Sequence, residues 1–135
     1  MLHACRRALK STGKAPQQVD YINAHGTATP VGEVAETGAI RSVFGGHAEK
    51  LAVSSTKSML GHALGGSVAI EAGIGVFALR DGVMPPTINL TEPDPDCDLD
   101  YVPEGVRKRE LDVVISNSFG FGGANTTLVL KRFEG

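Results

Sequence analysis

The stretch that decides the fold is VDYINAHGTATP, residues 19–30. Its first half, residues 19–24, is a compact apolar run that predicts a buried strand. The loop that follows is rich in glycine and threonine, and Pro30 is suited to open a helix because the first helical N–H needs no partner. Apolar residues then recur at helical spacing over residues 31–44. A strand, a polar loop and a helix in this order predict an α/β unit.

The remaining segments extend this unit at both ends. Residues 1–12 have apolar side chains at helical spacing and stop at a glycine, which predicts a short helix. Residues 51–54 predict a second buried strand, and residues 99–102 predict a short edge strand. Two β-branched runs, residues 111–118 and 125–131, predict a hairpin around a glycine-rich loop. We therefore expect an α/β domain with a mixed sheet.

Residues 63–79 are apolar or small almost all round, and a helix without a polar face is a buried helix. Its glycines would each cost about 1 kcal/mol relative to alanine in an exposed helix, so they predict close packing on more than one side. Glu71 is the only ionisable group within it, and a buried carboxylate must be paired, protonated or bound to a cation. The other predicted helices and strands are too few to cover such a helix on several faces. This indicates that the chain is part of a larger protein or assembly.

Composition excludes several classes of protein. The 135 residues carry 13 Lys and Arg against 15 Asp and Glu, and a net charge of -2 offers no polycation field for nucleic acid. The sequence contains no run of 18 apolar residues, so it predicts no membrane span, and residues 1–7 hold no apolar core of a signal peptide. Cys5 and Cys97 have no paired spacing, which suits a reducing compartment. We expect one domain that acts in the cytoplasm or in an organelle, with neither a nucleic-acid nor a membrane partner.

Polar clusters follow the first two predicted strands. His25 comes directly after residues 19–24, where an imidazole can donate a hydrogen bond or act as a base near neutral pH. Lys57 and His62 follow residues 51–54, just before the apolar helix, whose dipole favours the neutral form of a nearby imidazole. The alternative interpretations are a structural histidine in a turn, a surface lysine and a capping histidine. The residues alone leave both interpretations open.

A third cluster is the loop NSFGFGGAN, residues 117–125. Two aromatic residues, Phe119 and Phe121, flank a glycine there, although a simple hairpin turn needs neither the apolar area nor the backbone freedom. A gate or a set of backbone N–H donors would explain the combination. The loop is therefore a candidate part of an active site.

Other chemistries fit the sequence less well. The histidines at 25, 47 and 62 match no zinc spacing, and no H-E-x-x-H motif occurs. Cys97 lies between two aspartates, which makes its thiol a poor nucleophile, and the G-x-S-x-G elbow of serine hydrolases is missing. The basic run at residues 107–109 indicates a solvated loop, with a contact to an acidic partner as the alternative.

Four motifs resemble, in order, the C-terminal part of β-ketoacyl-acyl carrier protein synthases: residues 23–27, 55–62, 85–90 and 117–123. They are most similar to the elongating condensing enzymes of type II fatty acid synthesis, and polyketide ketosynthases are close relatives. The resemblance implies a thiolase-like half-fold, with a mixed sheet and a buried helix, in an enzyme that is usually a homodimer. It makes residues 1–135 a partial C-terminal β-ketoacyl synthase domain.

The resemblance also implies catalytic roles for residues that match the family's motifs. His25 and His62 would hydrogen-bond the malonyl thioester carbonyl and stabilise the enolate, and Lys57 would support the electrostatics of the site. Phe121 would be the gate and would contribute its N–H to the oxyanion hole. The oxyanion and gate loop would comprise Phe119, Gly120, Phe121 and Gly122.

Binding roles follow from the same resemblance. Thr27 and Thr29 would hydrogen-bond the phosphopantetheine arm that carries the substrates, so no separate cofactor is expected. In some members of the family a monovalent cation or a polar cluster occupies the positions that match Asn23, Glu71, Ser116 and Asn117. Such a cation is one answer to the isolated carboxylate of Glu71.

The implied reaction transfers an acyl group from acyl carrier protein to a cysteine, decarboxylates malonyl-acyl carrier protein and condenses the resulting carbanion with the acyl thioester. The nucleophilic cysteine lies in the family's N-terminal half, and neither Cys5 nor Cys97 matches it. We therefore expect an acyltransferase of fatty acid biosynthesis that is inactive without that half. The expected partners are acyl carrier protein, the N-terminal half and, in the complete enzyme, a second copy.

Two alternatives stand beside this interpretation: a non-catalytic module that binds the carrier protein or another partner, and the ketosynthase part of a polyketide synthase. Retention of His25, Lys57 and His62 argues against the binding module, and residues 54–59 favour the fatty acid pathway. Val68 adds bulk where glycine is usual, so the packing of the apolar helix is expected to differ locally. The sequence departs from the common pattern at Glu33, Leu60, Gly66, Ser67, Val68 and Ala124, where Asp, Thr, Ala, Ala, Gly and Thr are usual.

Overall fold

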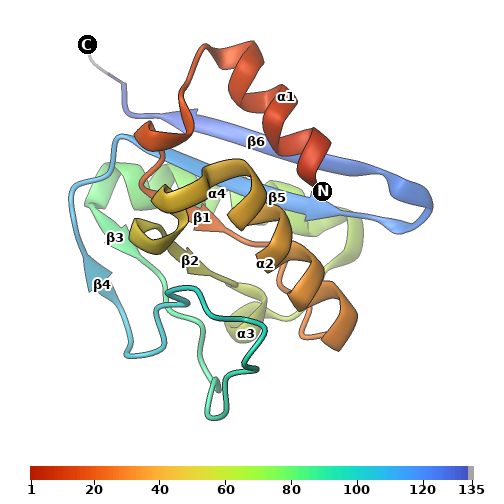
Figure 1. The fold of residues 1–135 in the computed structure, drawn as a ribbon. Coiled ribbons are helices and arrows are strands. Elements are labelled where there is room, and N and C mark those ends of the chain that lie inside the picture. Colours follow the sequence, from red (N-terminus) through yellow and green to blue (C-terminus); the bar gives the residue numbers. More distant parts are fainter. Residues whose placement is uncertain (134–135) are drawn as a thin grey trace.

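The computed structural model describes residues 1–133, and its centre is a mixed four-stranded sheet in the order β2-β1-β5-β6 (Figure 1). β1 (Tyr21–Asn23) is parallel to β2 (Ala52–Ser54) and to β5 (Val113–Phe119). β6 (Asn125–Lys131) is antiparallel to β5 and forms the predicted hairpin with it. The mixed α/β sheet expected from the sequence is confirmed.

Helices cover both faces of this sheet. α1 (Leu2–Thr12) and α2 (Pro30–Phe44) lie on one face, and α4 (Ser67–Asp81) lies on the other (Figure 1). β1, β2 and the first five residues of β5 are buried between these helices, whereas β6 is intermediate or exposed along its length. The core on the first face includes Leu9, Ile22, Ile40, Phe44, Val53 and Ile115, and the core on the second includes Tyr21, Ala52, Ala78, Leu79 and Val114.

The starts and ends of the helices follow the expected local signals. α1 ends at Gly13, whose φ of 65° is left-handed and therefore suits glycine. α2 begins at Pro30, as predicted, after Thr29 in an extended conformation. Short 3-10 turns join the longer elements, at Pro16–Gln18, Gly45–Lys50, Leu64–Gly66 and Phe121–Gly123.

The apolar helix α4 is covered on one side only, so the prediction of close packing on more than one side was wrong for this chain. Gly75 explains the contact with the sheet, because an added Cβ would lie 2.7 Å from Leu130 Cδ1. On the other side Val76 and Phe77 are 52% and 56% exposed. No element within residues 1–133 packs over this face. No helix in the same residues is long and apolar enough to cross a membrane.

The loop beside β2 differs from the prediction. Residues 99–102 do not form an edge strand, because only Asp100 bridges to Ala52 and Val102 has a left-handed φ of 52°. A small antiparallel ladder, β3 (Val83–Met84) with β4 (Arg107–Lys108), was not predicted. Strands of two residues are too short to produce a recognisable alternation in the sequence.

Candidate active site

The candidate site lies where three parallel strands end. Asn23 at the end of β1 is level with Ser54 of β2 and with Ser116 of β5. The loops that leave β1 and β2 therefore begin at the same edge of the sheet, beside the last residues of β5. Ligand sites of α/β sheets lie preferentially at such carboxyl ends.

Two of these loops are pressed together at Gly26. A Cβ added to Gly26 would lie 2.4 Å from the Cβ of Ser55, and its φ of 40° also disfavours other residues. Ser55 Oγ donates to the Gly26 carbonyl oxygen at 2.7 Å. Glycine at this position thus lets the loop with His25 contact the loop with Lys57.

His25 and His62 face each other in the structure. Their ring centroids are 5.5 Å apart in an edge-on arrangement, and the ring of Phe119 lies 5.4 Å from that of His25. Burial, together with the nearby Lys57 and His62, lowers the pKa of His25 to about 4. His25 is therefore neutral at pH 7, and its buried Nδ1 has no hydrogen-bond partner within residues 1–133.

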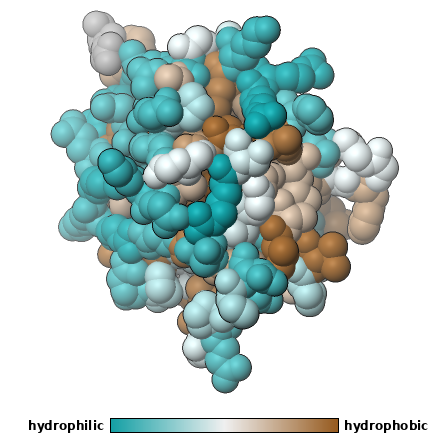
Figure 2. Space-filling model, in the orientation of Figure 1, coloured by the Kyte–Doolittle hydropathy of each residue, from teal (hydrophilic) through white to brown (hydrophobic). Residues whose placement is uncertain are grey.

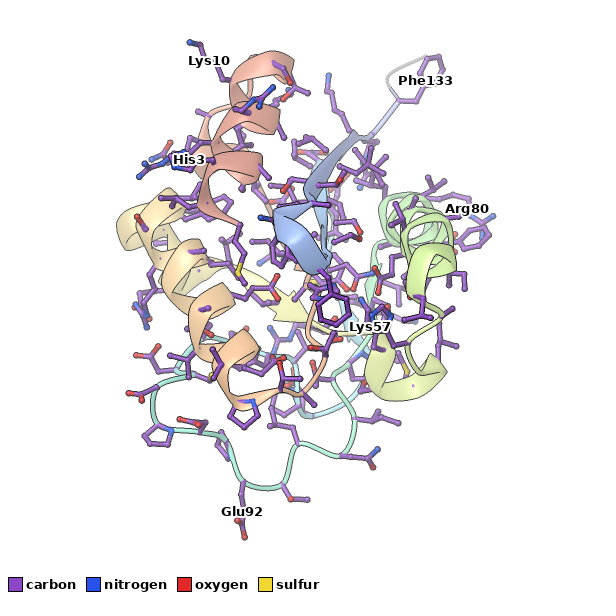
Figure 3. All side chains as sticks on the ribbon, turned by 90° about the vertical axis from the view of Figure 1, so that its right-hand side faces the viewer. His3, Lys10, Lys57, Arg80, Glu92 and Phe133 are labelled. Carbon is purple, nitrogen blue, oxygen red and sulfur yellow. The ribbon has the colours of Figure 1, made fainter. Side chains whose placement is uncertain are left out.

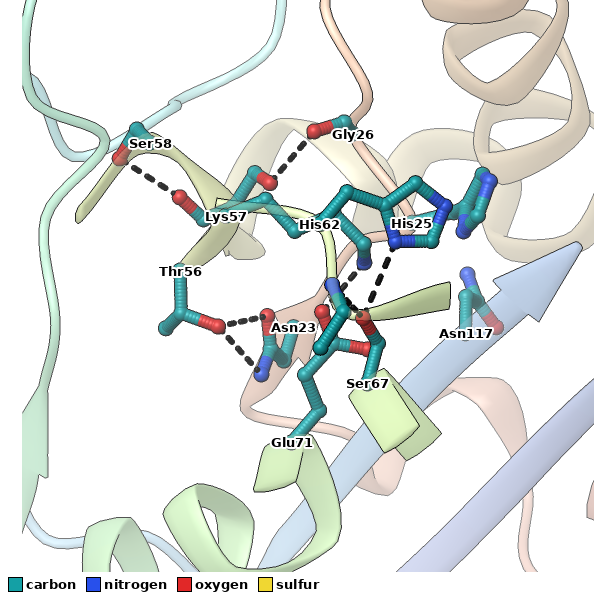
Figure 4. A network of polar contacts seen from close by, with 12 residues as sticks. Asn23, His25, Gly26, Thr56, Lys57, Ser58, His62, Ser67, Glu71 and Asn117 are labelled. Carbon is teal, nitrogen blue, oxygen red and sulfur yellow. Dashed lines mark hydrogen bonds and ion pairs between the residues drawn. The ribbon is translucent and has the colours of Figure 1, made fainter. Parts of the chain in front are cut away.

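His62 is held by a backbone N–H and by a neighbouring hydroxyl (Figure 4). The N–H of Leu64 donates to His62 Nδ1 at 3.2 Å, and Ser67 Oγ lies 3.0 Å from the same nitrogen. These contacts fix the ring at the amino-terminal end of α4. The sequence predicts His62 at this end of the helix, as a neutral donor or as a capping residue.

Lys57 and Glu71 form a buried ion pair. Their side chains are 5% and 2% exposed, and Lys57 Nζ donates to Glu71 Oε1. Figure 3 shows Lys57 turned inward, in contrast to Lys10 and Arg80, which project outward. Burial raises the pKa of Glu71, and the bond from Lys57 opposes that rise. The isolated carboxylate of the apolar helix is thus paired, and the alternative of a surface lysine is wrong, because α3 (Lys57–Leu60) begins inside the site.

The proposed cation set is not joined by hydrogen bonds between its members. Asn23 exchanges hydrogen bonds with Thr56 at 3.3 Å, Asn117 donates to Glu36, and Glu71 accepts from Lys57. Ser116 lies buried beside Asn23 in the sheet register. The monovalent cation at Asn23, Glu71, Ser116 and Asn117 stays a prediction.

Glu36 is a site residue that the sequence analysis missed. Its carboxylate is buried and accepts the backbone N–H groups of His25 and Gly26, both at 3.0 Å, and Asn117 Nδ2 at 3.1 Å. Burial raises the pKa of Glu36, and these donors oppose the rise. A glutamate on the buried stripe of α2, one turn before Ile40, was the available signal.

Thr27 and Thr29 lie together at the exposed end of the loop that joins β1 to α2. Their Oγ1 atoms are 3.4 Å apart, and a Cβ at Gly32 would lie 2.3 Å from Thr29 Oγ1. Glu33 accepts the N–H of Ala28 at 2.8 Å, which ties the loop to the first turn of α2. The two hydroxyls are therefore neighbours on a loop that reaches the surface.

The glycine-rich loop is divided between the site and the solvent. Phe119, at the end of β5, contacts His25, whereas Phe121 is fully exposed in the 3-10 turn Phe121–Gly123. Gly122 has a left-handed φ of 72°, and a Cβ added at Gly120 would lie 3.3 Å from the Ala124 carbonyl oxygen, a tight contact. The structure brings Phe119 into contact with His25 and leaves the side chain of Phe121 in solvent.

Comparisons with known proteins agree with this geometry. Residues 1–91 match the family model described as the C-terminal domain of β-ketoacyl synthase. The chain belongs to the β-ketoacyl synthase family. The synthase domain is 58% identical, over 94% of its length, to 3-oxoacyl-[acyl-carrier-protein] synthase 2 of Coxiella burnetii, of which it covers 31%.

Solved structures have the same thiolase-like fold as this synthase domain. A β-ketoacyl synthase from Burkholderia phymatum is 40% identical with a TM-score of 0.92, over 98% of this chain and 32% of that one. A type II polyketide ketosynthase, solved with its acyl-carrier protein, is 35% identical with a TM-score of 0.95, over 98% of this chain and 33% of that one. The domain spans about a third of the length of these relatives.

Proposed function

We propose that this synthase domain supplies the decarboxylation half of a condensing site that elongates acyl chains on acyl carrier protein. The observation that supports this function best is the pair of facing imidazoles, 5.5 Å apart, beside a buried lysine at the carboxyl ends of parallel strands. Neutral imidazoles can donate hydrogen bonds without adding a charge that would hold back a carboxylate. The 58% identity to a 3-oxoacyl-acyl-carrier-protein synthase favours the fatty acid pathway.

In the proposed reaction the thioester carbonyl oxygen of a malonyl group accepts hydrogen bonds from His25 and His62. The bond between the methylene carbon and the carboxylate breaks, carbon dioxide leaves, and the electron pair moves onto the carbonyl oxygen as an enolate. The two donors stabilise the charge that develops on that oxygen. The enolate carbon then bonds to the carbonyl carbon of the acyl thioester, and the thiolate that carried the acyl group leaves.

Lys57 acts on the site through its charge. Its position near His25 helps to hold that ring neutral, and Glu71 balances the buried ammonium. The pair therefore gives the site a fixed polar environment that requires no reorganisation during the reaction. We place Lys57 as an electrostatic group rather than as a proton carrier.

The substrate arm and the gate complete the proposal. Thr27 and Thr29 present two neighbouring hydroxyls that suit the amide groups of phosphopantetheine. Phe121 stands on a glycine-rich turn from which it could swing over the site, with the backbone of Phe119–Gly122 as the source of oxyanion donors. No cofactor besides the carrier-bound arm is proposed.

The missing parts of the enzyme lie outside this chain. We propose that an N-terminal part holds the nucleophilic cysteine and covers α4, whose apolar face is exposed at Val76 and Phe77. A second exposed apolar group lies where α2 begins. Figure 2 shows brown side chains there, and Val31 is 84% exposed. A dimer of complete chains and a cytoplasmic location are part of the same proposal.

The test compares the complete protein that carries this domain with its His62→Ala variant, using acyl- and malonyl-acyl carrier protein as substrates. Loss of one electrostatic donor is expected to lower β-ketoacyl formation about 10²- to 10³-fold. Ser42→Ala removes an exposed hydroxyl on α2 and is the folding control. Full activity in His62→Ala would reject the proposed mechanism.

The same assay separates the alternatives. Products that retain several keto groups would assign the protein to polyketide synthesis, the activity of the 35% identical neighbour. Carrier-protein binding without any condensation would indicate a binding module. A carrier-bound β-ketoacyl chain with a single keto group, two carbons longer than the acyl substrate, is the expected result.

A further inference from the structure

Ser67 is the first residue of α4 and is only 5% exposed. Its Oγ accepts the backbone N–H of Ala63 at 3.0 Å and lies 3.0 Å from His62 Nδ1 (Figure 4). A hydroxyl has one proton to donate and two lone pairs. Because the N–H of Ala63 occupies a lone pair, the hydroxyl proton is free to point to His62.

A second donor meets the same nitrogen from the backbone. The N–H of Leu64 lies 3.2 Å from His62 Nδ1 and can only donate. A proton on Nδ1 would face this N–H, donor against donor. The Leu64 contact therefore requires Nδ1 to be an acceptor, and the Ser67 hydroxyl, whose proton is free, donates to the same nitrogen. This arrangement leaves the ring proton on Nε2.

We propose that Ser67 is a positioning residue that keeps His62 in the Nε2–H tautomer, the form that donates to the enolate oxygen. This inference rests on the proposed function, because the tautomer of His62 affects the reaction only if Nε2–H donates to the enolate oxygen. Ser67 acts through His62 and itself touches no substrate. The backbone N–H of Leu64 alone would define the tautomer less firmly, since a single bond at 3.2 Å is long for an N–H donor.

The sequence makes this feature particular to the chain. Alanine is usual at the position of Ser67 in the family that the motifs resemble, and alanine has no hydroxyl to offer His62 or Ala63. Ser67→Ala is therefore expected to fold while it removes both hydrogen bonds. The substitution isolates the hydroxyl from the packing of the helix.

The test uses the complete protein with ¹⁵N-labelled histidine, and the His62 signals are assigned by their loss in His62→Ala. In the unchanged protein at neutral pH, Nδ1 is expected to have the shift of an unprotonated nitrogen and Nε2 that of a protonated one. In Ser67→Ala the two shifts are expected to move toward each other as the other tautomer becomes populated. Ser42→Ala, which removes an exposed hydroxyl beside Arg6 near the end of α2, is expected to leave the His62 shifts unchanged.

Kinetics supply the second measurement. Loss of a hydrogen bond of ordinary strength is expected to lower kcat for malonyl decarboxylation about 3- to 10-fold in Ser67→Ala, with KM unchanged. A merely structural role would lower stability without moving the nitrogen shifts.

Two results would overturn the proposal: a protonated Nδ1 in the unchanged protein, or identical His62 shifts in Ser67→Ala. Absence of decarboxylation in the unchanged protein would instead reject the proposed function, and the nitrogen shifts would still decide the tautomer.

Discussion

The two ends of the central sheet hold their charged groups in opposite ways. At the carboxyl ends of β1 and β2, the ion pair of Lys57 and Glu71 is almost fully buried. Beside Ala52, at the amino end of β2, Asp100 pairs with Arg107 of the small β3–β4 ladder, and these two side chains are 39% and 31% exposed. Burying a charge pair costs desolvation that the pairing seldom returns, whereas an exposed pair costs little. The costly burial of the Lys57–Glu71 pair indicates that the carboxyl ends of β1 and β2 are built for chemistry rather than for stability.

The largest expected effect breaks the buried pair. Lys57→Ala leaves the Glu71 carboxylate buried without its partner and is expected to lower the free energy of unfolding by about 3–5 kcal/mol. Denaturant titration of the complete protein measures the change. The double variant Lys57→Met with Glu71→Leu is the matched control, because an apolar pair of similar size is expected to be close to neutral in stability. A loss below 1 kcal/mol in Lys57→Ala would mean that the pair is solvated.

A smaller effect is expected where the two loops touch. Gly26→Ala places a Cβ 2.4 Å from Ser55 Cβ and forces a left-handed φ on alanine. We expect a loss of about 1–3 kcal/mol in stability from overpacking, and weaker catalysis because His25 is the next residue. Gly46→Ala is the control, since a Cβ there meets nothing within 4 Å. Equal stability of the two variants would contradict the close contact of the loops.

The pH dependence of stability tests the environment of His25. Its pKa is lowered to about 4, against about 6.5 for an exposed histidine. Between these values the unfolded state binds the proton and the folded state does not, so the stabilising contribution is present above pH 6.5 and is lost as pH falls toward 4. The unfolding midpoint in denaturant is expected to fall more from pH 7 to pH 5 in the unchanged protein than in His25→Gln. An equal fall of the midpoint in the two proteins would contradict the lowered pKa of His25.

The smallest effect is expected at the solvated end of the sheet. Arg107→Ala removes an exposed pair and is expected to change the free energy of unfolding by about 1 kcal/mol or less. The change should shrink further in high salt, because exposed charges are screened. A loss as large as that of Lys57→Ala would remove the contrast between the two ends.

Much of the fold could be predicted because it is encoded locally. The hairpin of β5 and β6 follows from two β-branched runs around glycines, and α2 follows from Pro30 and the helical spacing after it. The proximity of His25 and His62 was also predictable, because each follows a strand and the ends of parallel strands meet at one edge of the sheet.

The parts that could not be predicted depend on contacts between distant residues. Glu36 reaches from α2 to the backbone N–H of His25 in the loop after β1, and no spacing in the sequence reveals that bond. Lys57 was expected on the surface as one alternative, because its partner Glu71 lies 14 residues away on another helix. The one-sided cover of α4 was missed because an apolar helix indicates burial without indicating which chain supplies it.

The most direct test of the account is complementation. This chain would be mixed with a separately expressed N-terminal part of the same protein, and β-ketoacyl formation from acyl- and malonyl-acyl carrier protein would be measured for each part and for the mixture. The account predicts product only in the mixture, and none when His62→Ala replaces the unchanged chain. Product formation by this chain alone at the rate of the mixture, or an unimpaired mixture with His62→Ala, would contradict it.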